Sequence, residues 1–140
     1  MNETQRQRFD AILERVLEAL PAAVRAVIEE VPVIVEDRPA PELLESLRKQ
    51  GVLPDDEPEA DDELMGLHSG VAITEQSLGA SGELPPMIHV FRDAVVAEVG
   101  GWKIENAESE LAEEIRVTLL HEIGHHFGLD EDDLDELGYG

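Results

Sequence analysis

Apolar residues near the start of the chain recur at intervals of three and four, which is the spacing of one face of an α-helix. The stripe consists of Phe9, Ile12, Leu13, Val16, Leu17 and Leu20. This pattern predicts an amphipathic helix over residues 4 to 20, and Thr4 followed by Gln7 is consistent with a capping box at its start. We expect the apolar stripe to enter the core.

Shorter elements are predicted over the next thirty or so positions. Pro21 suits the first turn of a second helix, whose apolar positions are Val24, Val27 and Ile28. The sequence VPVIVE at 31–36 predicts a strand, and Pro32 predicts that this strand lies at a sheet edge or begins there. Pro41 predicts a third helix, and Gly51 is well placed to end it.

The middle of the chain alternates polar loops with short strands. Residues 54–63 hold seven carboxylates and two prolines, a composition that predicts a solvated loop. Residues 64–67 and 71–73 predict two short strands or one strand with a bend. A second loop, rich in Gly and Pro, is predicted over 75–86. The alternating sequence MIHVF at 87–91 predicts a strand that is covered on both faces.

The last third of the chain predicts a long helix. Two glycines at 100–101 interrupt the chain, and Asn106 is a suitable cap for a helix over 107–127. Apolar residues at four-residue steps support it, namely Leu111, Ile115, Leu119 and Ile123. Gly128 is expected to end this helix, and a last short helix is predicted around residues 134–137.

Composition narrows the classes of function. The chain has 140 residues and a mass of 15.4 kDa, which predicts one domain over residues 1–140. It contains no cysteine, so a disulfide framework, a cysteine-ligated metal and a thiol nucleophile are excluded. Any metal ion must therefore bind to His, Asp or Glu.

Charge indicates the kind of partner. The chain holds 33 acidic and 10 basic side chains, a formal net charge of -23. This surplus repels phosphate backbones and anionic headgroups, so we expect neither nucleic acid nor a membrane surface as a partner, and we expect basic peptides or cations to suit the protein better. The polar start MNETQRQRFD predicts no signal peptide, and the expected location is the cytosol.

The predicted long helix contains the motif H-E-x-x-H as His121-Glu122-Ile123-Gly124-His125. Residues four apart lie on one helix face, so both imidazoles can reach one ion. Zinc accepts two imidazoles and a carboxylate and keeps a fourth position for water. Glu122 would lie beside that water, where it can accept a proton as a general base. A chance match of this motif has an expectation of about 0.03 in a chain of this composition.

The motif continues as H-E-x-x-H-x-x-G-x-x-D, in which Asp130 is the last residue. Gly128 can adopt a left-handed conformation that turns the chain back, so Asp130 is a candidate third ligand. The alternative interpretation is that Asp130 caps the last short helix. The remaining histidines, His68, His89 and His126, have no ligand spacing and are expected to be packed or hydrogen-bonded side chains.

Residues 116–139, RVTLLHEIGHHFGLDEDDLDELGY, resemble the C-terminal signature of the minimal zincin family of small predicted bacterial metallopeptidases. The sequence LPAAVRAVIEEVPVIVEDRP, a glycine-containing turn near Gly66 and Gly70, and the predicted strand MIHVFRD also resemble that family. The resemblance implies a mixed α/β (α+β) domain in which a short sheet packs on helices, including a long active-site helix. It also implies one zinc ion held by His121, His125 and Asp130, with Glu122 as the base.

These observations predict a zinc-dependent, peptidase-like hydrolase acting on a peptide or protein. His and carboxylate ligands also accept manganese, iron or cobalt. One alternative is a metal-bound domain that binds a peptide or protein without cleaving it. Another is an interaction module that holds a structural metal and binds a basic partner through its acidic surface.

Overall fold

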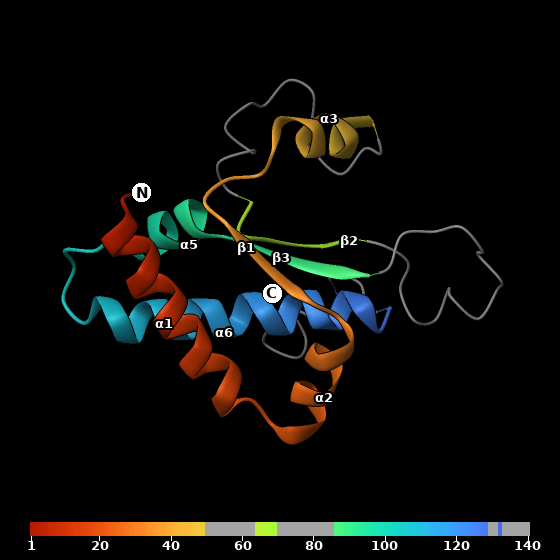
Figure 1. Ribbon diagram of the computed structural model, residues 1–140, viewed down its shortest axis with the longest axis horizontal. Coiled ribbons are helices and arrows are strands. Elements are labelled where there is room, and N and C mark those ends of the chain that lie inside the picture. The colour runs from red at the N-terminus through yellow and green to blue at the C-terminus, as the bar shows by residue number, and fades with distance from the viewer. Residues whose placement is uncertain (50–63, 70–85, 129–131, 133–140) are drawn as a thin grey trace, which may run out of the picture.

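The computed structural model describes residues 1–49, 64–69, 86–128 and 132. These residues form five helices and one three-stranded sheet, an α+β arrangement (Figure 1). The predicted fold class is therefore confirmed, and the predictions for other residues lie outside the described part of the chain.

The first helix, α1, spans Glu3–Ala19, close to its predicted range. Its capping box is different from the predicted one, which paired Thr4 with Gln7. The side chain of Asn2 accepts a hydrogen bond from the backbone N–H of Gln5 at 2.8 Å, and Oε1 of Gln5 accepts one from the N–H of Asn2 at 3.2 Å. The reciprocal pair satisfies two backbone donors two residues earlier than expected.

A mixed sheet forms the centre of the fold. Its strands are β1 (Val33–Glu36), β2 (Gly66–Ser69) and β3 (Met87–Phe91), in the order β1-β3-β2. The central strand β3 is parallel to β1 and antiparallel to β2. The prediction that Pro32 precedes or opens an edge strand is confirmed. The predicted strand at 64–67 begins later, at Gly66, and includes Ser69; residues 71–73 lie outside the described part of the chain.

Two short helices flank β1 in sequence, α2 (Ala22–Glu30) and α3 (Pro41–Lys49). A further helix, α5 (Arg92–Val99), follows β3 directly and was not predicted. It ends at Gly100, whose left-handed backbone (φ 103°) suits glycine. The long helix α6 spans Ala107–His126 and packs against α1, α5, β2 and β3. Figure 1 shows α6 on one side of the sheet and α3 on the other.

The core lies between the sheet and helices α1, α5 and α6. Fully buried side chains from these elements include Phe9, Ile12, Ile88, Val90, Val95, Leu111, Ile115 and Leu119. The predicted apolar stripes of α1 and α6 therefore face the core. Leu17 of α1 is an exception, because it is only partly buried. This packing holds α6 against β2, so the H-E-x-x-H motif on α6 lies beside the sheet.

An ion-pair network ties α1 to the ends of two strands. Nε and Nη2 of Arg92 donate to the carboxylate of Asp10 at 3.0 and 2.9 Å, and Nη1 donates to Asp37 at 3.0 Å. Arg6 donates to the same Asp37 at 2.8 Å through Nε. The hydrogen bonds from Arg6 and then Arg92 lower the pKa of Asp37. The network links α1, the residue after β1 and the start of α5.

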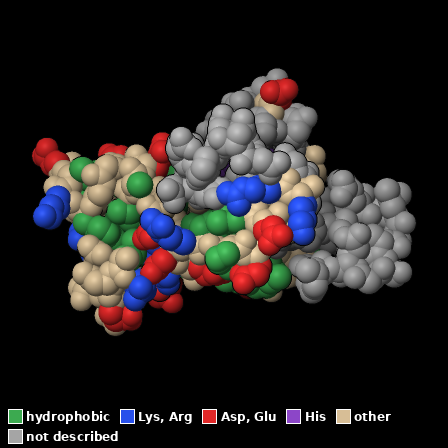
Figure 2. Space-filling view, turned by 90° about the horizontal axis from the view of Figure 1, so that it is seen from above, with side chains coloured by type: hydrophobic (Ala, Val, Ile, Leu, Met, Phe, Trp, Pro, Cys, Tyr) green, Lys and Arg blue, Asp and Glu red, His purple; other side chains and the backbone are tan. Residues whose placement is uncertain are grey.

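Most of the basic side chains are paired with carboxylates. At least seven of the ten form such ion pairs, namely Arg6, Arg8, Arg15, Arg38, Lys49, Arg92 and Arg116. Figure 2 shows acidic and basic side chains side by side on one face of the molecule. The acidic surplus is thus carried by carboxylates that these cations do not neutralise. Among the described residues, no helix is long and apolar enough to cross a membrane.

Candidate metal centre

The motif lies in the last two turns of α6. Asn106 occupies the N-cap position of this helix, as predicted, but its side chain makes no capping hydrogen bond and its backbone is left-handed (φ 60°). At the other end the N–H of Gly128 donates to the carbonyl of His125 at 2.9 Å, and Gly128 has φ 83°. The chain therefore leaves the helix at Gly128, as expected.

The two imidazoles of the motif face each other. Nε2 of His121 and Nε2 of His125 are 3.1 Å apart, and their rings meet at 79° with centroids 4.8 Å apart. Two nitrogens that bind one zinc ion tetrahedrally at about 2.0 to 2.1 Å lie about 3.3 Å apart. The two side chains are half-buried, so an ion between them could still exchange ligands with solvent. The donor pair therefore fits zinc.

Glu122 completes the cluster from the buried side of the helix. One ligand atom from each of His121, Glu122 and His125 lies within 4.8 Å of the others. Glu122 is 6% exposed, and its Cγ lies 3.2 Å from the position that a Cβ would take on Gly66 of β2. The carboxylate thus belongs to the face of α6 that packs on the sheet, while the imidazoles lie beside it.

The predicted third ligand, Asp130, lies outside the described residues, so its role stays a prediction. The catalytic role of Glu122 and the ligand roles of the two histidines likewise stay predictions. Asp132 is described and exposed.

His126 and His89 pack against aromatic rings and lie near carboxylates of other residues. His126 is buried on α6, edge-on to the ring of Phe127 with centroids 5.5 Å apart, and burial lowers its pKa while the charge of Glu30 opposes the shift. Nδ1 of His89 lies 3.7 Å from Oε1 of Glu36, and its ring stacks on Phe91. Neither is part of the cluster. The side chain of His68 lies outside the described part.

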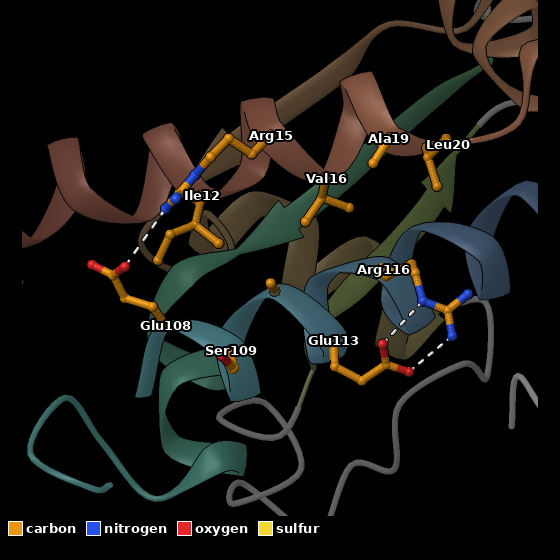
Figure 3. A pocket seen from close by; sticks show the side chains of 10 residues that line it. Ile12, Arg15, Val16, Ala19, Leu20, Glu108, Ser109, Glu113 and Arg116 are labelled. Carbon is orange, nitrogen blue, oxygen red and sulfur yellow. Dashed lines mark hydrogen bonds and ion pairs between the residues drawn. The ribbon is translucent and has the colours of Figure 1, made fainter. Parts of the chain in front are cut away.

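A groove runs between α1 and α6 (Figure 3), and no histidine is among the described residues that line it. It encloses about 490 Å³ above an apolar floor that includes Ile12 and Val16. At its rim Arg116 donates to Glu113 at 2.8 and 3.0 Å. None of the three cluster residues lines it, so this groove is not the opening of the candidate metal centre.

Sequence reasoning missed one neighbour of the site. Gly66 lies against Thr118 and Glu122. Thr118 follows Gly66 by 52 positions in the chain. A glycine inside a strand can mark a close approach of another segment, and this was the signal available. The sequence alone does not say which segment approaches.

Comparison with known families agrees with this geometry. A family model described as zincin-like metallopeptidase matches residues 28–140. The match includes all three strands and the whole of α6, and it covers well over half of the chain. A comparison with curated proteins gives no match. The chain belongs to the zincin-like metallopeptidase family.

Proposed function

We propose that this protein is a zinc-dependent peptidase, with His121, His125 and Asp130 as the metal ligands and Glu122 as the general base. The observation that carries the proposal is the 3.1 Å separation of two imidazole nitrogens with a buried carboxylate between them in sequence. Membership of a metallopeptidase family supports it. We further propose that residues 1–140 form a single domain that acts in the cytosol.

Zinc, when bound, polarises the scissile carbonyl and lowers the pKa of a water molecule toward about 7. Glu122 accepts a proton from that water as the oxygen of the water adds to the carbonyl carbon. The same carboxyl group then gives the proton to the amide nitrogen as the C–N bond breaks. The second proton of the water stays with the products, a carboxylic acid and an amine that become a carboxylate and an ammonium group, and Glu122 ends the cycle ionised.

Asp130 is proposed as the third ligand because Gly128 ends the helix in a left-handed turn one turn after His125. Such a turn reverses the chain and can bring a following carboxylate toward the histidine face. If Asp130 instead caps a following helix, Asp130→Asn keeps zinc, since asparagine caps as well as aspartate does. We expect Asp130→Asn to weaken zinc binding about tenfold or more.

The substrate is proposed to be a peptide or protein that carries basic residues. The net charge of -23 attracts such chains, and most of the cations of the protein are already paired. Cleavage of a basic peptide should therefore fall as salt is raised, because screening weakens attraction between exposed charges.

The test compares wild type with Glu122→Gln on a peptide library, each with and without a chelator. We expect metal-dependent cleavage by wild type, a loss of about 10² to 10³ in kcat in the variant, and equal zinc content in both. Turnover that survives Glu122→Gln contradicts the assigned base. Zinc-dependent peptide binding without products favours the non-catalytic binding domain. A melting temperature that falls sharply on chelation, again without products, favours a structural metal.

A further inference from the structure

Gly66, the first residue of β2, lies so close to helix α6 that a side chain at this position would collide with the helix. A Cβ at this position would lie 2.7 Å from Cγ2 of Thr118, 3.2 Å from Cγ of Glu122 and 3.3 Å from the carbonyl oxygen of His89. Carbon atoms that are not bonded prefer separations of about 3.5 to 4.0 Å. The first contact therefore requires that something move.

The requirement for glycine is steric and not conformational. Gly66 pairs with Val90 in the antiparallel ladder, in an extended strand that any residue can adopt. The described glycines with positive φ are Gly100, Gly101 and Gly128. The two closest contacts come from α6 and the third from the backbone of β3, so a side chain at Gly66 would collide mainly with the helix.

The atoms that would be displaced belong to the proposed active-site helix. Thr118 and Glu122 are one turn apart on α6, and each is 6% exposed. Thr118 is β-branched, so its side chain has few alternative rotamers in a helix. Since α6 also packs on α1, α5 and β3, the helix has little freedom to retreat, and a side chain at position 66 would push on Glu122.

We propose that Gly66 is a positioning residue: it lets α6 rest directly on the backbone of β2, and this contact sets where the Glu122 carboxylate lies relative to the two imidazoles. Its effect on turnover rests on the proposed function. Its effect on the placement of Glu122 does not.

The test substitutes Gly66→Ala and measures steady-state cleavage and zinc affinity. We expect kcat to fall by about 10- to 100-fold with KM within about twofold, because a displacement of about 1 Å at a catalytic group has effects of this size. Zinc affinity should stay within about threefold, since the three atoms nearest to a Cβ at position 66 belong to Thr118, Glu122 and the backbone of His89 and not to either imidazole. The matched control is Leu67→Ala, whose side chain points to the opposite face of the sheet because successive strand residues alternate.

A second-site variant tests the contact itself. Thr118→Ser removes Cγ2, the atom closest to the added methyl group. We expect Gly66→Ala/Thr118→Ser to recover kcat to within about threefold of Thr118→Ser alone. If Gly66→Ala does not fold, the double variant should fold and recover the measured properties. A double variant that recovers nothing contradicts the proposal.

A binding measurement reports on Glu122 without turnover. Acetohydroxamate binds a metal ion as an anion, and a carboxylate beside the metal accepts its proton. On zinc-loaded protein we expect Glu122→Gln and Gly66→Ala each to weaken acetohydroxamate by about tenfold, with recovery in the double variant.

The two proposals fail in distinguishable ways. If wild type cleaves no peptide but acetohydroxamate affinity changes as described, the proposed function fails and the role of Gly66 stands. If wild type cleaves peptides but Gly66→Ala keeps its kcat and acetohydroxamate affinity, the role of Gly66 is refuted. Loss of zinc in step with activity in Gly66→Ala also refutes it, because the variant would then damage the whole centre.

Discussion

Arg92→Met removes the centre of the network that joins α1, β1 and α5. The guanidinium is 12% exposed and makes three charged hydrogen bonds of 2.9 to 3.0 Å, two to Asp10 and one to Asp37. Methionine keeps most of the length of the side chain and its apolar contacts but leaves both carboxylates without this partner.

The loss in the free energy of unfolding expected for Arg92→Met lies between the loss for a buried ion pair and the loss for an exposed one. Breaking a fully buried pair costs about 3 to 5 kcal/mol, and an exposed pair contributes about 0 to 1 kcal/mol. Asp10 is 47% exposed and Asp37 keeps Arg6, so water and a second cation compensate part of the loss. We expect a loss of about 2 kcal/mol in the free energy of unfolding. A domain of 140 residues unfolds with an entropy of about 0.3 kcal/mol/K, so the melting temperature should fall by about 7 °C.

The assay is thermal and urea unfolding of wild type, Arg92→Met and the control Arg15→Met at pH 7. Arg15 also pairs with a carboxylate, Glu108, but at 3.8 Å and with 65% of its side chain exposed. Its substitution changes net charge equally and should lower the melting temperature by less than about 2 °C. Equal shifts in the two variants would show that overall charge, and not the buried network, decides the stability.

Two further predictions concern ionisation. Hydrogen bonding from Arg6 lowers the pKa of Asp37 below its ordinary value, so its carboxylate stabilises the fold above the unfolded pKa near 3.9 and this stabilisation is lost as pH falls through the lower folded pKa. Asp37→Asn should therefore lose most stability relative to wild type above about pH 5, and the difference measured by urea unfolding should shrink toward pH 2. Burial and then Glu98 raise the pKa of Glu114, so its charge is disfavoured in the fold, and Glu114→Gln should raise the melting temperature at pH 7. A lower melting temperature would contradict this.

The elements that could be predicted from the sequence are those whose apolar period is long and uninterrupted. α1 buries one stripe from Phe9 to Val16 and α6 buries one from Leu111 to Ile123, and that period is visible in the residues alone. The helix α5 was missed because its buried residues, Ala94, Val95 and Val96, are consecutive and follow a strand with no turn between them. Consecutive valines favour a strand by propensity, and tertiary packing overrides that preference here.

The same distinction between local and distant contacts applies to the candidate site. His121 and His125 are brought together by helical spacing, so four residues of sequence suffice to predict that their rings meet. The contact between Gly66 and Thr118 depends on how α6 packs on the sheet, which no local pattern reports. Local sequence is ambiguous even for the capping box, because Asn2–Gln5 and Thr4–Gln7 both satisfy its spacing. The structure shows that Asn2 and Gln5 form it.

The position of Glu122 is an energetic argument for function. It follows Ile115 and Thr118 at helical spacing on the side of α6 that packs on the sheet, where an apolar residue would cost nothing to bury. Burying a carboxylate costs several kcal/mol unless a partner compensates it, so an accidental motif would more readily place this group in solvent. A carboxylic side chain at a core-facing position, opposite a glycine that leaves it room, departs from the apolar composition that is usual in a core, and such departures occur at functional sites. The burial of Glu122 thus supports a chemical role more strongly than the spacing of the histidines alone.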